Sequence, residues 1–155
     1  MKVREAGLEK RIILTGSIKH AKMPVYLSLA DCGVAPFDTS KHLPLRTAGF
    51  FWSPLKIFEY MAMGLPTVTA DLPPLNQIIR PGQEGALFTE GDPTDLARSL
   101  REILAPDQTA AQSRAAMGHS ARERVTQDFS WKAHCRSLND LIDELAVKDV
   151  EFARK

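Results

Sequence analysis

The sequence predicts an α/β fold built around a parallel sheet. Short apolar runs rich in β-branched residues alternate along the chain with segments of helical periodicity, and glycine or proline separates most of them. The expected strands are residues 11–15, 31–36, 66–70 and 85–89. The expected helices are residues 2–9, 22–30, 53–64, 75–79, 92–104, 109–127 and 131–146.

Length and composition indicate one domain of ordinary globular character. The chain has 155 residues, and 20 Lys and Arg side chains stand against 19 Asp and Glu, for a formal net charge of +1. This balance argues against a nucleic-acid binder, because such proteins need a large positive excess. No apolar run reaches the roughly 20 residues of a membrane span, and the start of the chain does not resemble a signal peptide. We therefore expect a cytoplasmic protein.

The two cysteines, Cys32 and Cys135, lie far apart and lack the spacing of a metal motif. Both are expected to be reduced and structural, and no metal site is predicted.

Two helix starts carry clear capping signals in the sequence. Asp92 followed by Pro93 predicts a capped helix, and Ser130 is the expected cap of the last helix, whose long apolar stripe from Trp131 to Leu145 must pack against something.

The segment 53–64 has start and stop signals for a short helix with charges inside an apolar body. Ser53 is the expected cap, Pro54 suits the first helical position, and Gly64 is expected just beyond the helix end, before Pro66. The backbone N–H groups of Leu55, Lys56 and Ile57 would then point out of the helix start. Because the helix dipole is positive there, we predict a site suited to a diphosphate.

Two charged residues of this helix, Lys56 and Glu59, are candidates for ligand contacts. Lys56 would add a cation to the anion site, and the Glu59 carboxylate could accept two hydroxyl hydrogen bonds, as a ribose offers. The alternative is a solvated i,i+3 salt bridge between them, which is the commoner outcome for charged residues on helices and contributes a few tenths of a kcal/mol.

A second candidate region is the turn Gly16-Ser17-Ile18, which follows the expected strand 11–15. Ligands collect at the carboxyl ends of strands in open α/β sheets, so this turn could border a ligand. An equally good explanation is that Gly16 simply permits a turn. The expected loop 37–52 is long enough to suggest a functional or a mobile segment.

With these signals in order, the chain resembles the carboxyl-terminal, donor-binding domain of GT-B retaining glycosyltransferases of family 4, also called group 1. The resemblance spans nearly the whole chain. The segments that support it are 15–20, 24–27, 30–36, 53–66, 82–85, 91–93 and 129–131. It implies a Rossmann-like parallel sheet with helices on both faces, in a single partial domain over residues 1–155 with terminal helices at about 109–147.

The resemblance also implies roles for the candidate residues. A nucleoside-diphosphate sugar would be the donor, with its diphosphate at Ser53, Pro54 and the N–H groups of Leu55 to Ile57, and no other cofactor is implied. Lys56 would stabilise the leaving diphosphate. Glu59 corresponds to the second Glu of the family's Glu-x7-Glu motif and would bind the ribose, and Gly16, Ser17 and Ile18 would border the base. The acceptor would belong to an amino-terminal domain or a complementing chain.

Two departures from the family pattern limit these implications. The position of the first Glu of the motif is Phe51 here, and the strand, glycine turn and basic pair that normally open the domain do not precede residue 11. The chain is therefore expected to be the second half of a donor domain, a truncated product or a piece of a larger enzyme, that binds donor weakly and turns over little. The alternative is a non-catalytic nucleotide-binding or scaffold remnant. Action at a membrane surface is common in the resembled family, but no basic amphipathic anchor indicates it here.

Overall fold

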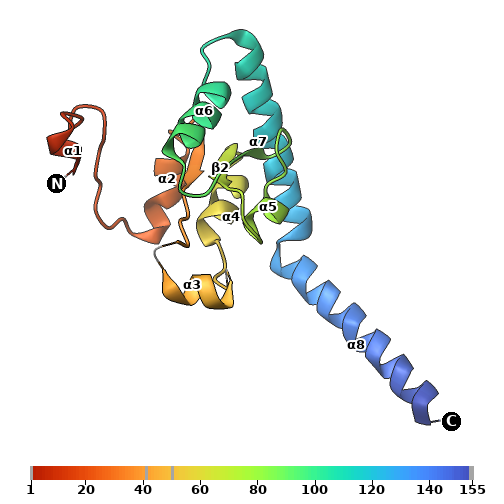
Figure 1. Cartoon of the computed structure of the whole chain (residues 1–155). Coiled ribbons are helices and arrows are strands. Elements are labelled where there is room, and N and C mark those ends of the chain that lie inside the picture. Colours follow the sequence, from red (N-terminus) through yellow and green to blue (C-terminus); the bar gives the residue numbers. More distant parts are fainter. Residues whose placement is uncertain (1, 41, 50, 154–155) are drawn as a thin grey trace.

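The protein folds around a small parallel sheet. The structure, a computed structural model, describes residues 2–40, 42–49 and 51–153. Strands β1 (Gly33–Ala35), β2 (Thr67–Ala70) and β3 (Gly85–Phe88) lie side by side in that order, with Val34 opposite Val68 and Val68 opposite Ala86 (Figure 1). Three of the predicted strands are therefore confirmed, each within one or two residues.

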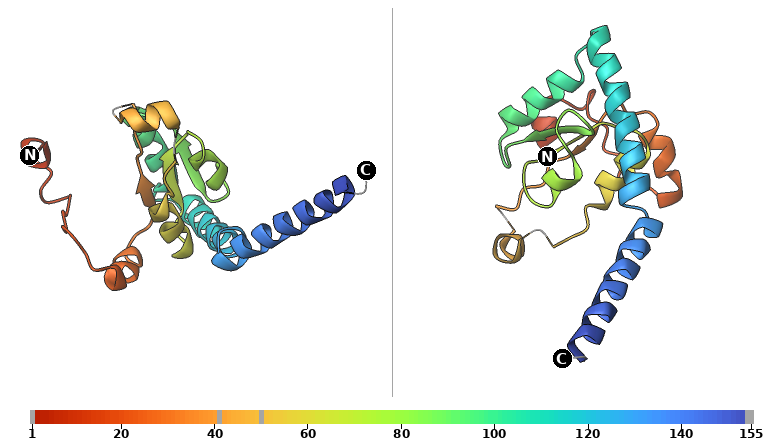
Figure 2. Two further views of the ribbon diagram at one scale, coloured as in Figure 1. Left: turned by 90° about the horizontal axis from the view of Figure 1, so that it is seen from below. Right: turned by 90° about the vertical axis from the view of Figure 1, so that its right-hand side faces the viewer.

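Helices cover both faces of this sheet. On one face, α4 (Leu55–Ala62), α5 (Leu75–Ile78) and α7 (Gln108–Asp128) enclose a core that includes Ile57, Met61, Leu75 and Val125. On the other face, α6 (Pro93–Ile103) packs Ile103 against Val68, Ala70 and Phe88. Figure 2 shows α6 and α7 on opposite sides of the strands. The predicted Rossmann-like α/β architecture is confirmed.

The end of α4 and the middle of α7 meet at two glycines. Gly64 follows the last turn of α4 at φ +70°, and the N–H groups of Gly64 and Leu65 donate to the carbonyls of Met61 and Tyr60. These bonds form a Schellman motif, which confirms Gly64 as the residue after the helix. Gly118 of α7 lies against the Gly64 carbonyl oxygen, and a Cβ at Gly118 would stand only 2.1 Å from it.

The predicted strand 11–15 is wrong. The described part of the chain has no ladder partner for this segment, which is extended and exposed, with Ile13 85% and Leu14 62% accessible. It lies apart from the sheet, between α1 (Lys2–Glu5) and the 3-10 turn His20–Lys22 (Figure 1). An apolar β-branched run needs a neighbouring strand to satisfy its backbone groups.

The segment 37–52, predicted as a loop, contains a helix, α3 (Leu43–Ala48). Pro44 lies in its first turn, and Leu45 anchors it with 6% of its surface exposed. The preceding helix, α2 (Met23–Leu27), is shorter than the predicted 22–30. Burial of one leucine therefore gives α3 a fixed place despite its weak periodicity.

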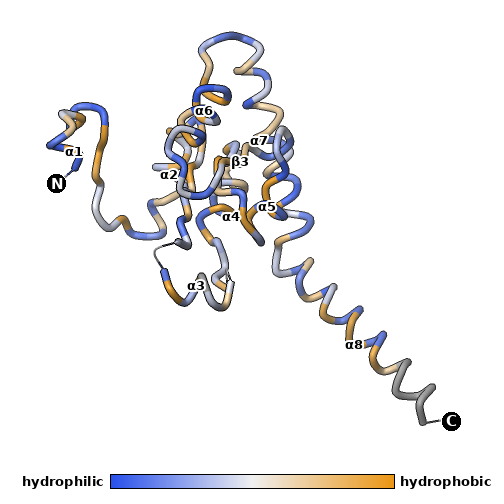
Figure 3. Tube along the Cα trace, in the orientation of Figure 1, coloured by the Kyte–Doolittle hydropathy of each residue, from blue (hydrophilic) through white to orange (hydrophobic). Residues whose placement is uncertain are grey.

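The last helix, α8 (Trp131–Ala153), extends away from the body of the protein (Figure 1). The N–H of Ala133 donates to Ser130 Oγ at 3.2 Å, so the predicted cap is confirmed. Apolar residues recur along α8 in Figure 3, and Leu138, Leu141, Ile142 and Leu145 are each about half exposed. Packing of this stripe against another surface stays a prediction. No helix in the described ranges has the length and apolarity needed to cross a membrane.

Candidate functional site

The carboxyl ends of the three strands form one edge of the sheet, because all strands run parallel. The loop after β1 begins at Pro36, the turn after β2 at Asp71, and the loop after β3 at Thr89. Loops at this edge are where open α/β sheets bind their ligands. The candidate site therefore lies among these loops and α4. This helix connects β1 to β2 in the chain and packs on the sheet.

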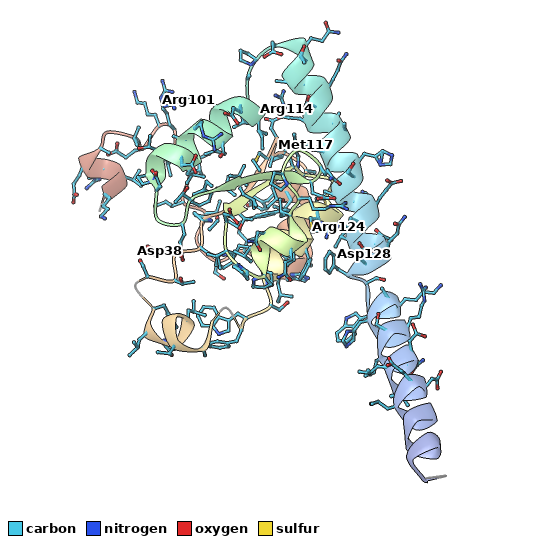
Figure 4. The ribbon with its side chains drawn as sticks, turned by 45° about the vertical axis from the view of Figure 1, so that its right-hand side comes forward. Asp38, Arg101, Arg114, Met117, Arg124 and Asp128 are labelled. Atoms are coloured by element: carbon cyan, nitrogen blue, oxygen red, sulfur yellow. The ribbon has the colours of Figure 1, made fainter. Side chains whose placement is uncertain are left out.

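Two of these loops are joined by a hydrogen-bonded carboxylate. Glu90, after β3, accepts hydrogen bonds from the N–H of Thr39 and from its hydroxyl, the latter at 2.6 Å. Asp38 accepts a hydrogen bond from the N–H of Ser40 at 3.0 Å and lies on the side of the sheet near α3 (Figure 4). A hollow of about 280 Å³ lies between the two loops and the start of α6 at Pro93. Glu90 thus fixes the β1 loop on the edge of the sheet.

The start of α4 differs from the prediction. Pro54, not Ser53, is the cap residue, and no side chain caps the helix. Pro54 has φ −81° and ψ 61°, the geometry of an inverse γ-turn, and the Leu55 N–H accordingly donates to the Ser53 carbonyl at 2.9 Å. The Ile57 N–H donates to the Pro54 carbonyl at 2.8 Å. Two of the three N–H groups predicted to face a ligand are therefore used within the helix start.

Lys56 is exposed and points toward the end of β1. Its Nζ lies 5.0 Å from the centroid of the Phe37 ring, a cation–π contact. Phe37 also lines the hollow between the β1 and β3 loops. The structure thus places the cation of α4 close to the carboxyl end of β1. The predicted anion site at the helix start stays a prediction.

Glu59 lies one turn further along α4 and contacts the segment that precedes α2. Its Oε1 is 3.8 Å from His20 Nδ1, and both side chains line a hollow of about 210 Å³ with Met23 and Pro24. The i,i+3 salt bridge between Lys56 and Glu59 does not occur among the ion pairs of the described residues, since Lys56 contacts Phe37 and Glu59 contacts His20. The two side chains therefore have separate partners.

The turn 16–18 is not part of either hollow as described. Gly16 has φ +67°, and a Cβ added to it would have no atom within 4 Å; Ser17 is exposed, and Ile18 is half-buried. Because the strand 11–15 does not form, this turn does not sit at a strand end. It does lead directly into His20, which the structure brings to Glu59.

Sequence reasoning missed three residues of this region, namely Phe37, Thr39 and Glu90. The signal available for them was position, since each follows a predicted strand at its carboxyl end. Their pairing could not be foreseen, because 51 residues separate Thr39 from Glu90. In the part of the chain that the structure describes, no three His, Cys, Asp or Glu side chains gather as a metal site would require.

The sheet and its helices define an open α/β protein of the Rossmann-like class. A family model described as "Glycosyl transferases group 1" matches residues 1–106. The chain belongs to this family.

Comparisons with known proteins agree with this assignment. The chain is 32% identical over 117 residues to a glycogen synthase of Mycobacterium tuberculosis, and the match covers 76% of this chain and 25% of that protein. Its fold matches sucrose-phosphate synthase from Thermosynechococcus elongatus with a TM-score of 0.74 and 27% identity, over 95% of this chain and 33% of that one.

A third similar protein is Anabaena Alr3699/HepE, solved in complex with UDP and glucose. The TM-score is 0.71 at 18% identity, over 92% of this chain and 35% of that one, so the likeness is one of fold. The present chain thus spans about a quarter to a third of the length of the three proteins compared.

Proposed function

We propose that this chain is the donor-binding part of a retaining glycosyltransferase, which takes a glycosyl group from a nucleoside-diphosphate sugar. The observation that supports this most directly is the position of Lys56, an exposed cation beside Phe37 at the carboxyl edge of a parallel sheet. Membership of the group 1 glycosyltransferases supplies the class of reaction.

In this proposal the diphosphate contacts the start of α4, Ser53 to Ile57, with Lys56 supplying the charge. A fixed cation stabilises the negative charge that develops on a leaving diphosphate, and this effect is usually the largest single contribution to catalysis of such transfers. The Leu55 and Ile57 N–H groups would have to exchange their present partners for the phosphate oxygens.

The Glu59 carboxylate would accept hydrogen bonds from the ribose hydroxyls. It is 37% exposed and lines a hollow, with His20 Nδ1 3.8 Å from its Oε1, so it is open to a ligand. Gly16, Ser17 and Ile18, which precede His20, would border the base. No protein nucleophile is assigned.

The acceptor would be held by an amino-terminal domain or by a complementing chain, and residues 1–155 would form one partial donor domain.

The exposed apolar segment 11–15 also favours a second candidate function, a non-catalytic nucleotide-binding or scaffold remnant that needs another polypeptide to complete its sheet. The cytoplasmic location of the protein stays a prediction.

Calorimetric titration of the chain with UDP, GDP and ADP tests the proposal. We expect saturable binding of one nucleotide, weakened at least tenfold in Lys56→Ala and unchanged in Lys10→Ala, which removes an equal charge from an exposed position outside the site. The absence of binding by a folded chain would refute a self-sufficient donor site and favour the remnant.

A further inference from the structure

The last helix, α8, presents an apolar stripe that no other described part of the chain covers. Figures 1 and 2 show α8 leaving the body of the protein at the end of α7 and extending away from it. Every side chain of residues 134–146 is exposed. A helix without tertiary contacts is only marginally stable in water, so burial of its apolar side would stabilise it.

The stripe has the spacing of a coiled-coil seam. Its members follow one another at intervals of four, three, four and three residues, and they are Trp131, Cys135, Leu138, Ile142 and Leu145. This alternation places the side chains in a narrow row along one side of the helix, and it is the spacing with which two helices pack as a pair. A second helix therefore fits the stripe.

The charges beside the stripe select the direction of that second helix. At about 100° per residue, Lys132, Arg136 and Asp143 lie on one flank of the stripe, with both cations in its first half and the acid in its second. None of the three belongs to an ion pair among the described residues. A parallel helix of the same sequence would set like charges side by side, whereas an antiparallel one sets opposite charges side by side.

We propose that α8 binds the α8 of a second copy of this chain in antiparallel orientation, so that the protein forms a homodimer. Lys132 of each copy then faces Asp143 of the other, and the two stripes cover each other around Leu138, their middle member. Such an isologous contact uses the same surface on both copies and needs no further component. Because the row is short, we expect a dimer that dissociates on dilution. The contact is independent of the proposed donor site.

Sedimentation velocity of the whole chain tests for this dimer. We expect the wild type to dimerise as its concentration is raised from the micromolar to the millimolar range. Leu138→Glu should stay monomeric, because it would bury two carboxylates against each other at the centre of the row. Ile13→Glu is the matched control, since Ile13 is 85% exposed in the apolar segment 11–15, and it should dimerise as the wild type does.

Charge reversal tests the direction of the two helices. Lys132→Glu and Asp143→Lys should each dimerise at least fivefold more weakly, because each change sets like charges against each other at both ends of the contact. An equimolar mixture of the two variants should regain the wild-type affinity, since both pairs again have opposite signs. A parallel dimer would be weakened by neither single change, because its facing charges are alike before and after, and this result would overturn the antiparallel arrangement.

A wild-type chain that stays monomeric at millimolar concentration would overturn the proposal and leave the stripe to a different polypeptide. A dimer that Ile13→Glu disrupts and Leu138→Glu does not would also overturn it, and would place the contact at segment 11–15. Because nucleotide is absent from these experiments, their outcome is separate from that of the donor titration.

Discussion

The contact between Gly118 and Gly64 predicts that Gly118→Ala destabilises the protein, whereas helix propensity alone predicts that it stabilises the protein. Gly118 lies inside α7, where alanine is usually favoured over glycine by about 1 kcal/mol. In this fold, however, the Cβ of an alanine would lie 2.1 Å from the Gly64 carbonyl oxygen. Gly64 itself is fixed by its φ of +70° in the Schellman motif, so the backbone of α4 would have to move.

Overpacking of this kind costs about 1–3 kcal/mol, and a backbone obstacle at so short a distance favours the upper end. After the propensity gain is subtracted, Gly118→Ala should lower the free energy of unfolding by about 1–2 kcal/mol. Urea denaturation followed by circular dichroism measures this change in the free energy of unfolding. Ala116→Gly, at an exposed position of α7, is the control and should cost about 1 kcal/mol. A Gly118→Ala chain as stable as the wild type, or more stable, would refute the close approach of α4 and α7.

Two further predictions concern buried ionisable groups. Burial raises the pKa of the Glu84 carboxyl, but hydrogen bonds from Arg80 and the charge of Arg124 outweigh it and hold this pKa below its ordinary value. The resulting stabilisation is complete above the unfolded pKa of about 4.3 and is lost as the pH falls through the folded value. Glu84→Gln should therefore lower stability at pH 7 by about 3 kcal/mol and flatten the acid side of the melting profile, and an unchanged profile would contradict this network. Burial raises the pKa of the Cys32 thiol to about 11, whereas Cys135 is exposed. Iodoacetamide at pH 8 should therefore modify Cys135 before Cys32, as followed by mass spectrometry. Faster modification of Cys32 would contradict its burial.

Signals from neighbouring residues in the sequence were sufficient to predict much of the fold. The strands at 33–35, 67–70 and 85–88 follow from apolar runs between turn residues, and the Asp92 side chain accepts hydrogen bonds from the N–H groups of Thr94 and Asp95 as its sequence position predicts. Each of these features is determined by neighbouring residues along the chain, so the sequence specifies it directly.

Features that depend on distant partners were not predictable. The segment 11–15 has the composition of a strand, but a strand forms only beside another strand, and none is available to it among the described residues. The same reason applies to the site. Glu90 binds Thr39, and His20 approaches Glu59, through contacts between loops that no local pattern encodes.

The start of α4 is an intermediate case. A Ser-Pro pair usually predicts a serine cap with proline in the first turn, but here Pro54 adopts an inverse γ-turn that moves the helix start forward by one residue. Lys56 still lies in the first turn of α4, as the sequence predicted, and because α4 follows β1 in the chain its side chain reaches Phe37 just beyond the end of that strand.

In the proposed donor site, Lys56 contacts the diphosphate and Glu59 the ribose of one bound nucleotide. The most direct test is calorimetry of UDP and uridine, or of the nucleotide and nucleoside of whichever base binds, against the wild type, Lys56→Ala and Glu59→Ala. We expect that Lys56→Ala weakens binding of the nucleotide and leaves binding of the nucleoside unchanged, while Glu59→Ala weakens binding of both by a similar factor. Equal affinities of the wild type and both variants for the nucleotide would contradict it.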